Sequence, residues 1–331
     1  MSLPSFQLLR PRTLSEAVDL LGKHAPQIQI IAGGTDLIPA LRQGLFAPKY
    51  VLDIRGIEEL RGIRVRRGSG VEIGALTTLT AVEDSEFIRR YYPVLHEAAA
   101  TVASPILRNM GTIGGNICLD TRCLWYNQSL AWRKACGFCI KKEGDLCHVA
   151  PGGKRCWAVF SGDTPPALLC LSAEIEVAGP NGERRVPLRD FYTNAGEARM
   201  KLGPDELLTR VFLGDASAGW RGIYRKLRIR GSIDYPLAGV AVALKLKKSG
   251  RGRTVESARV AITALNPAPM LIEEADRVLA GRAVNDHVAE ILAELAARTA
   301  KPLTTSALTP EYRREMIRVF TKRALLAVAQ G

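Results

Sequence analysis

Five of the chain's seven cysteines lie between residues 123 and 156. They are Cys123, Cys136, Cys139, Cys147 and Cys156. Four thiolates can hold a Zn²⁺ ion tetrahedrally or bind an iron–sulfur cluster. Structural zinc sites typically use two closely spaced cysteine pairs, whereas only Cys136 and Cys139 form such a pair here, and this favours a cluster. Spacing alone selects Cys136, Cys139, Cys147 and Cys156 as ligands, with His148 either a substitute ligand or a solvated loop histidine.

Two glycine loops form the second group of candidate binding residues. The first comprises Ala32, Gly33, Gly34, Thr35, Asp36 and Leu37, and the second follows Gly111 with Thr112, Ile113, Gly114, Gly115 and Asn116. Glycine permits positive φ and a close approach of backbone N–H groups to an anion, and a threonine hydroxyl adds a donor. Either loop alone is most simply a tight turn, but the pair predicts a phosphate-bearing ligand. Neither loop has the G-x-G-x-x-G or P-loop pattern, which disfavours nucleoside triphosphate chemistry.

The composition is that of an ordinary globular protein. The chain has 331 residues, of which 47% are hydrophobic and 24% charged, and its formal net charge is +13. Lysine and arginine are scattered and no nucleic-acid-binding motif is present, so the charge does not indicate nucleic acid. No apolar run has the length of a membrane span or signal peptide, and an odd number of cysteines argues against a disulfide scaffold. We therefore predict a soluble, cytoplasmic protein.

The helices and strands that position these groups are predicted from hydrophobic periodicity and from the positions of capping residues, glycine and proline. The sequence predicts a helix from Thr13 or Ser15, the strand "IQII" and a short helix ending at Gly44. "YVLDI" and "VEIGAL" are typical of strands, residues 79–102 of a helix broken at Pro93, and "AGPNGERRVPL" of a hairpin with Asn181 and Gly182 at its turn. Beyond a boundary near 214–220, strands are expected over 221–265 and helices over 270–329.

Several segments together resemble a known family. "AGGTDLIPALRQG", "GTIGGNI", "SGDTPPALLCLSAEIEV", "YRKLRIRGSIDYPLAGVAVAL" and "PEYRREMIRVFTKRAL" resemble the FAD-binding medium subunit of the xanthine oxidase family of molybdenum enzymes over nearly the whole chain. "DTRCLWYNQS" and the cysteines after it resemble the β subunit of 4-hydroxybenzoyl-CoA reductase, which carries a 4Fe-4S cluster in an inserted loop.

The resemblance implies a ligand set different from the one that spacing selects. It assigns the cluster to Cys123, Cys139, Cys147 and Cys156, and leaves Cys136 without a counterpart. Cys118 and Cys170 lie in apolar runs and are expected to be buried small hydrophobic residues.

The resemblance also implies FAD contacts and a fold. The FAD contacts are the two glycine loops, Asp163 and Lys226. Asp163 could cap the helix that follows it, either instead of contacting FAD or in addition, and Lys226 could be a solvated strand residue. The implied fold class is α+β: FAD-binding subdomains over 1–58 and 59–216, an iron–sulfur insertion at about 120–160, and a C-terminal α+β domain over 217–331.

The implied function is electron transfer without substrate chemistry in this chain, so no catalytic residue is assigned. Electrons from a ferredoxin-like donor would pass through the 4Fe-4S cluster and FAD to a small 2Fe-2S subunit and a large molybdenum-cofactor subunit, in a dimer of heterotrimers. Residues 133–156 hold six basic residues against two acidic ones, which either form a docking surface for an acidic donor or only keep an exposed loop soluble. The six are Arg133, Lys134, Lys141, Lys142, Lys154 and Arg155.

Three alternatives stay open. One is the medium subunit of another molybdenum hydroxylase or aldehyde oxidoreductase, in which electrons run outward from substrate. The second is a zinc-stabilised binding module without a redox role. The third concerns the C-terminal helix, whose basic residues, Arg313 among them, could bind a membrane; packing of Ile317, Phe320, Ala324 and Val328 into the domain core is the preferred interpretation.

Overall fold

The N-terminal part of the chain is a small parallel sheet with two helices. The computed structural model describes residues 2–66, 68, 70–250 and 252–330. Strands β1 (Gln7–Leu9), β3 (Tyr50–Asp53) and β2 (Ile28–Ile31) pair in that order. The two helices are α1 (Leu14–His24) and α2 (Leu37–Arg42). The Thr13 hydroxyl accepts a hydrogen bond from the Glu16 amide, so the predicted cap is confirmed.

A second sheet of five antiparallel strands follows, in the order β4-β5-β8-β6-β7. The strands are β4 (Ile63–Arg66), β5 (Gly70–Gly74), β6 (Glu174–Gly179), β7 (Gly182–Pro187) and β8 (Leu207–Leu213). Its helices are α3 (Leu79–Asp84), α4 (Glu86–Tyr91), α5 (Pro93–Ala100), α6 (Pro105–Arg108), α7 (Ile113–Ile117), α9 (Thr164–Cys170) and α10 (Leu188–Phe191). Short 3-10 turns are η1 (Ile54–Gly56), η2 (Glu58–Leu60) and η3 (Asp215–Ser217). The predicted hairpin is confirmed as β6–β7, with Gly179 paired to Gly182.

The predicted helix over 79–102 is divided more than expected. Besides the break at Pro93, Ser85 ends α3 and begins α4, where its hydroxyl accepts a hydrogen bond from the Ile88 amide. A serine in extended conformation stabilises a new helix start better than it continues an old helix.

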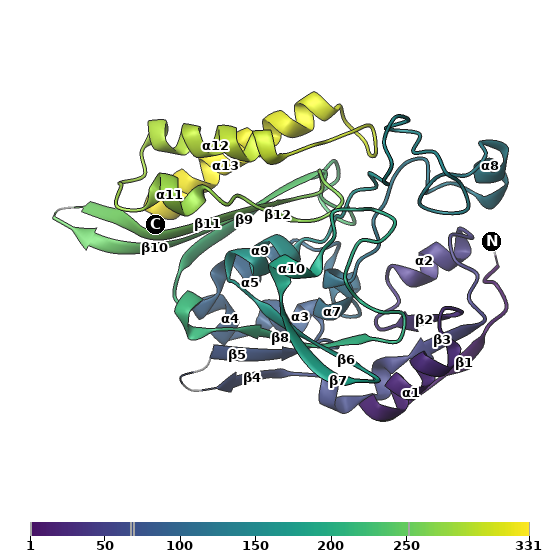
Figure 1. Ribbon diagram of the computed structural model, residues 1–331. Coiled ribbons are helices and arrows are strands. Elements are labelled where there is room, and N and C mark those ends of the chain that lie inside the picture. Colours follow the sequence, from purple (N-terminus) through teal and green to yellow (C-terminus); the bar gives the residue numbers. More distant parts are fainter. Residues whose placement is uncertain (1, 67, 69, 251, 331) are drawn as a thin grey trace.

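The C-terminal part has one sheet covered on both faces. The sheet has the order β12-β11-β10-β9 and contains β9 (Arg221–Leu227), β10 (Ala238–Ser249), β11 (Gly252–Thr263) and β12 (Met270–Leu271). Helices α11 (Ala275–Leu279), α12 (Asp286–Thr299) and α13 (Pro310–Gln330) cover one face, and α5 and α9 lie between this sheet and the five-stranded one (Figure 1). Apolar side chains of both sheets and of α5 and α9 share one core. Ile317, Ala324 and Val328 of α13 are buried in the other core, and Phe320 packs against it, which confirms the packing interpretation of this helix.

Residues 120–160, here called the cysteine segment, form a largely irregular excursion between α7 and α9. It contains the short helix α8 (Leu130–Ala135) and lies beside α2 in Figure 1. The Arg133 guanidinium donates to the Gly44 carbonyl at 2.7 Å, and the Leu124 amide donates to Thr305 O at 2.8 Å. The segment is thus attached both to the N-terminal part and to the loop before α13.

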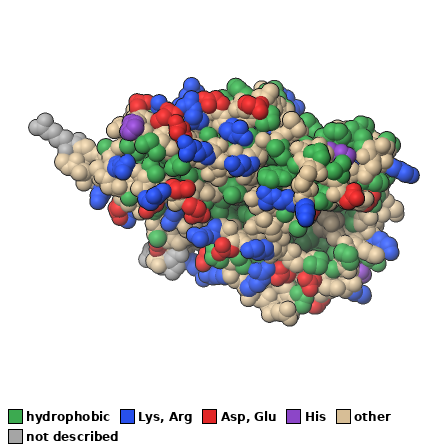
Figure 2. Space-filling view, turned by 45° about the horizontal axis from the view of Figure 1, so that its top comes forward, with side chains coloured by type: hydrophobic (Ala, Val, Ile, Leu, Met, Phe, Trp, Pro, Cys, Tyr) green, Lys and Arg blue, Asp and Glu red, His purple; other side chains and the backbone are tan. Residues whose placement is uncertain are grey.

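The surface carries charges of both signs. On the face shown in Figure 2, lysine and arginine side chains are interspersed with aspartate and glutamate rather than gathered in one patch. Among the described residues, no helix combines the length and apolar character required to cross a bilayer.

Candidate functional site

The two glycine loops lie against each other. The first connects β2 to α2, and a Cβ atom added to Gly33 would lie 1.8 Å from the Met110 carbonyl oxygen, just before the second loop. Gly34 has φ +74°, a conformation that favours glycine. Both positions therefore require glycine, one for contact and one for backbone conformation.

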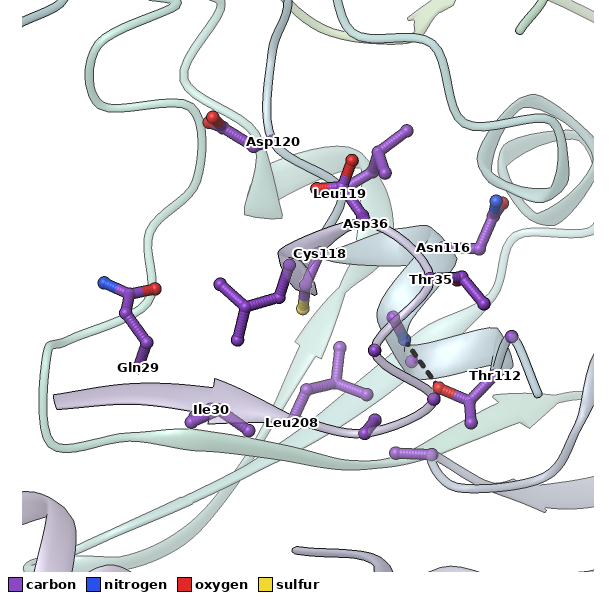
Figure 3. A pocket seen from close by; sticks show the side chains of 18 of the residues that line it. Gln29, Ile30, Thr35, Asp36, Thr112, Asn116, Cys118, Leu119, Asp120 and Leu208 are labelled. Atoms are coloured by element: carbon purple, nitrogen blue, oxygen red, sulfur yellow. Dashed lines mark hydrogen bonds between the residues drawn. The ribbon is translucent and has the colours of Figure 1, made fainter. Parts of the chain in front are cut away.

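The second loop leads into α7. Thr112 accepts a hydrogen bond from the Gly115 amide at 3.1 Å (Figure 3). A Cβ atom on Gly114 would lie 2.8 Å from Ala75, so this turn packs closely on the chain after β5. The amides of Ile113, Gly114, Gly115 and Asn116 all donate to oxygens within the chain, so a phosphate-bearing ligand would bind backbone N–H groups of the first loop.

A cavity of about 760 Å³ adjoins both loops, within the size range of small-molecule sites. Most of the predicted FAD contacts line it. They are Ala32, Gly33, Gly34, Thr35, Asp36, Leu37, Thr112, Gly114, Gly115, Asn116 and Asp163. Two predicted contacts do not belong to the lining: Ile113 is fully buried in the core, and Lys226 lies behind Asp163.

Asp163 is held by two side chains of β9. Lys226 Nζ lies 3.0 Å from one carboxylate oxygen and 2.9 Å from Thr101 O, and the Tyr224 hydroxyl donates to the other carboxylate oxygen at 2.8 Å. Burial raises the pKa of Asp163, while Lys226 opposes this effect. Two alternatives were wrong: Asp163 makes no side-chain capping bond to α9, and the Lys226 side chain is only 3% exposed. Asp163 stands at the N-cap position of α9, but Pro165 and Pro166 occupy the second and third positions of the helix and have no N–H that its carboxylate could accept from.

Sequence reasoning missed one whole wall of the cavity. Cys118, Leu119 and Asp120 line it, and so do residues 199–208 and 233–235 in part (Figure 3). Cys118 was expected to be an inert core residue, but it lies in the cavity wall, where burial raises the pKa of its thiol to about 11. An apolar neighbourhood cannot distinguish a core position from a ligand-cavity position, and this explains the error.

Asp120 connects this wall to the cysteine segment. Lys141 Nζ lies 3.0 Å from Asp120 Oδ1, and Arg199 Nη1 lies 3.4 Å from the same oxygen. Burial alone would raise the pKa of Asp120, but Lys141 and Arg199 hold it below its ordinary value. Arg199 also donates to the carbonyls of Cys118 and Leu119, both at 3.1 Å.

The thiols of the cysteine segment converge next to this wall. Cys123, Cys147 and Cys156 are buried and Cys139 is half-buried. Burial raises the pKa of Cys123, and Cys147 and Cys139 lie near enough to add to this effect. Burial likewise raises the pKa of Cys156 to about 12. The Ala158 amide donates to Cys156 Sγ at 3.3 Å, which favours the thiolate at this position.

The separation of these thiols bears on the kind of group they suit. In the described part of the chain, no three Cys, His, Asp or Glu side chains are close enough to hold a single metal ion. Thiolates around a four-iron cluster stand further apart than thiolates around one zinc ion, because the cluster's own atoms lie between them. His148 lies 2.6 Å from Phe138 O through Nε2, and its ring stacks on Trp125 with centroids 4.5 Å apart.

Three of the six basic residues expected to form a docking surface point inward instead. Arg133 is 2% exposed and the Lys141 side chain 6% exposed, while Lys142 binds the Leu45 carbonyl. The expected surface is therefore reduced to Lys134, Lys154 and Arg155. The three inward-pointing side chains instead attach the segment to neighbouring parts of the chain, because Arg133, Lys141 and Lys142 each donate to a carbonyl oxygen there.

Comparison with known proteins shows the same architecture. The family model described as the FAD binding domain in molybdopterin dehydrogenase matches residues 4–214, and that described as the CO dehydrogenase flavoprotein C-terminal domain matches residues 222–328. The chain belongs to the FAD-binding medium subunits of the xanthine oxidase and CO dehydrogenase family of molybdenum enzymes. It is therefore an FAD-binding oxidoreductase subunit, and the alternative of a zinc-stabilised module without a redox role is wrong.

Individual members of this family match over most of their length. The carbon monoxide dehydrogenase medium chain of Afipia carboxidovorans is 32% identical over 97% of this chain and 96% of its own. The aldehyde oxidoreductase FAD-binding subunit of Escherichia coli is 34% identical over 83% of this chain and 86% of its own. The structure of carbon monoxide dehydrogenase from Hydrogenophaga pseudoflava matches with a TM-score of 0.80 at 29% identity, over 100% of this chain and 99% of the other. These matches confirm the predicted α+β fold class.

Proposed function

We propose that this chain is the FAD- and 4Fe-4S-containing electron-transfer subunit of a molybdenum enzyme similar to 4-hydroxybenzoyl-CoA reductase, which reductively dehydroxylates its substrate to benzoyl-CoA. The observation that supports the proposal is that Cys123 and Cys156 share one small buried cluster, with Cys147 and Cys139 near Cys123, in the segment that Lys141 joins to Asp120 of the cavity wall. The proposed partners are a small 2Fe-2S subunit, a large molybdenum-cofactor subunit and a ferredoxin-like donor, in a dimer of heterotrimers.

The residues of the cavity fit FAD. The first glycine loop would hold the pyrophosphate through backbone N–H groups, with the second loop packed beside it, and Asp163 would be a further contact whose carboxylate Lys226 fixes. Bound FAD supplies electron exchange in one- and two-electron units. The protein contributes the position of the ligand and the exclusion of water.

The four thiols fit an iron–sulfur cluster. Three of them are buried and the fourth is half-buried, and Cys156 Sγ accepts an amide hydrogen bond from Ala158. Amide donors to sulfur and burial are the features by which a protein sets a cluster's potential. Cys136 caps the C-terminus of α8 and is not part of the proposed ligand set.

A second candidate is the medium subunit of an enzyme that oxidises its substrate and passes electrons outward. The names of the relatives favour it, because carbon monoxide dehydrogenase and aldehyde oxidoreductase are such enzymes. The Asp-Thr-Arg-Cys element and the cysteines after it favour the reductase.

Metal and flavin analysis of the complex, purified anaerobically with its partner subunits, tests the proposal. We expect about four irons and matching acid-labile sulfide beyond the 2Fe-2S clusters, lost in Cys123→Ser and kept in Cys136→Ser. If the iron is lost in Cys136→Ser and kept in Cys123→Ser, the ligands are instead the set that spacing selects, which contains Cys136 in place of Cys123. Absence of the extra iron from the wild type would reject the cluster and leave the outward-running candidate.

A further inference from the structure

The flavin cavity is lined mainly by acidic rather than basic side chains. Five carboxylates border it, whereas Arg199 is the one lysine or arginine among the described lining residues. The carboxylates belong to Asp36, Asp120, Asp163, Glu206 and Asp234. FAD carries a doubly charged pyrophosphate, so uncompensated carboxylates around it would oppose binding.

Each of these carboxylates is paired with a basic side chain placed behind the cavity wall. The pairs are Asp36 with Arg122 at 2.8 Å, Asp120 with Lys141 at 3.0 Å, Asp163 with Lys226 at 3.0 Å, Glu206 with Arg184 at 2.9 Å and Asp234 with Arg230 at 2.6 Å. None of these five basic residues lines the cavity. Two of them, Arg122 and Lys141, belong to the cysteine segment, and the other three do not.

Lys141 is committed to this pairing. Its ammonium contacts Asp120 Oδ1, Thr121 Oγ1 at 2.6 Å and Gly196 O at 2.7 Å, so its three N–H donors are used. The side chains of Lys141 and Asp120 are each 6% exposed. The other Asp120 oxygen is buried without a hydrogen-bond partner in the described structure. The compensation of Asp120 therefore depends on Lys141 and, at a longer distance, on Arg199.

Arg122 compensates a carboxylate of the first glycine loop. Its guanidinium binds Asp36, which belongs to the first glycine loop and also accepts a hydrogen bond from the Tyr235 hydroxyl at 3.1 Å. The Arg122 side chain is 14% exposed, so solvent weakens this pair only in part.

We propose that the cysteine segment is a charge-compensating wall of the flavin cavity, in which Lys141 and Arg122 neutralise Asp120 and Asp36 and thereby determine the affinity for the dinucleotide. The inference rests on the proposed FAD role of the cavity, but not on the identity of the group that the thiols hold. Lys141 and Arg122 act as positioning residues, because they contact the carboxylates and do not line the cavity that would hold FAD.

Single and double substitutions in the full-length chain, freed of flavin, test this proposal. The dissociation constant for FAD is measured by fluorescence titration at low and high salt. We expect Lys141→Met to weaken FAD binding about tenfold or more and Arg122→Met by a smaller factor, because Asp36 is more exposed than Asp120. Lys134→Met, in the same segment but exposed and a member of none of these pairs, is the control that removes the same charge and is expected to bind FAD as the wild type does.

The double variant Asp120→Asn/Lys141→Met separates charge compensation from a purely structural role. Removing the unpaired carboxylate is expected to restore the dissociation constant to within about threefold of the wild type. Asp120→Asn alone is expected to bind FAD at least as tightly as the wild type, which keeps the test valid if Lys141→Met folds poorly. FAD binding by Lys141→Met equal to that of the control, or a double variant as weak as the single one, would overturn the proposal.

Iron content measured on the same samples keeps the two hypotheses apart. Normal iron with weak FAD binding in Lys141→Met supports charge compensation directly. A wild type without iron rejects the cluster, yet the pairing of Lys141 with Asp120 still predicts the same loss and rescue of FAD affinity.

Discussion

At the scale of single residues, the sequence predicts backbone requirements better than the placement of charge. Gly33 and Gly34 could be identified because a turn needs glycine for local reasons. Lys141 could not, since an isolated lysine looks like a surface residue and only tertiary structure reveals the carboxylate that makes its burial tolerable. Lys226 was selected by the resemblance alone, and its pairing with Asp163 was not predicted.

Replacing Lys226 by methionine tests the buried network around Asp163. The change leaves a buried carboxylate with only the Tyr224 hydroxyl as partner, and we expect it to lower the free energy of unfolding by about 3 kcal/mol or more at pH 8. Tyr224→Phe removes one hydrogen bond and is expected to cost about 1–3 kcal/mol. Denaturant titration of the two variants, with the exposed Tyr312→Phe as control, measures both values.

The cost of Lys226→Met should depend on pH. Burial already raises the pKa of Asp163, and removing the lysine raises it further above the unfolded value of about 3.9. The folded variant then binds more protons than the unfolded chain, so its stability falls as pH rises from about 4 through the raised pKa. We expect a smaller difference from the wild type at pH 5 than at pH 8, and equal differences at both would contradict an unpaired Asp163.

At the scale of elements, capping residues and the hairpin turn predict where helices and strands begin, but not what an irregular segment packs on. Thr13 and the Gly179–Gly182 hairpin were predictable because their interactions are local. The docking of the cysteine segment on α2 and on the loop before α13 depends on pairs such as Arg133 with Gly44, which are distant in the sequence. The conformation of this segment had no periodic signal to predict it.

Arg313 is the clearest case of a helix residue with a long-range structural role. It was counted among the surface charges of the C-terminal helix, but it is fully buried and donates to the carbonyls of Leu237, Ala264 and Leu303. Burial lowers its pKa to about 10. It joins α13 to the end of β11, the start of β10 and the loop before the helix.

Arg313→Met is therefore expected to destabilise the C-terminal part strongly. The change removes the Arg313 donor from the carbonyls of Leu237 and Ala264, at about 1–3 kcal/mol each before relaxation, whereas Leu303 O still accepts from the Thr305 amide and hydroxyl. Arg314→Met, one position along the helix and exposed, removes the same charge and should shift the thermal midpoint little. Equal midpoints for the two variants would show that α13 is held by its apolar face alone.

At the scale of the whole molecule, the resemblance predicted the fold class because matching segments span nearly the entire chain. Periodicity could not predict that α5 and α9 lie between two sheets and join them through one core, since both helices are short and mostly apolar. The boundaries at residues 58 and 216 fall between sheets and remain predictions. The net charge of +13 likewise did not predict a basic surface patch. Some of the basic residues, such as Lys141 and Lys226, are buried in ion pairs with carboxylates of the flavin cavity.

The basic residues that do stay exposed in the cysteine segment define what is left of the docking hypothesis. Lys134 and Lys154 are exposed, and Arg155 lies over the Trp157 ring at 4.2 Å. We expect Lys134→Glu/Lys154→Glu to slow reduction of the complex by an acidic one-electron donor several-fold at low salt, because like charges reduce the rate of encounter. Stopped-flow measurement of the second-order rate constant across ionic strength tests this.

Lys247→Glu/Lys248→Glu, at the exposed tip of the β10–β11 hairpin, is the matched control, because it changes the net charge equally at a site far along the chain and on another sheet. A rate effect confined to the cysteine-segment variant, and lost at about 0.5 M salt, where exposed charges are screened within a few ångströms, supports local docking. Equal slowing by both variants would mean that the total charge steers the donor. No slowing in either would mean that the donor approaches elsewhere, and that the lysines and arginines of the segment serve the cavity and its attachment alone.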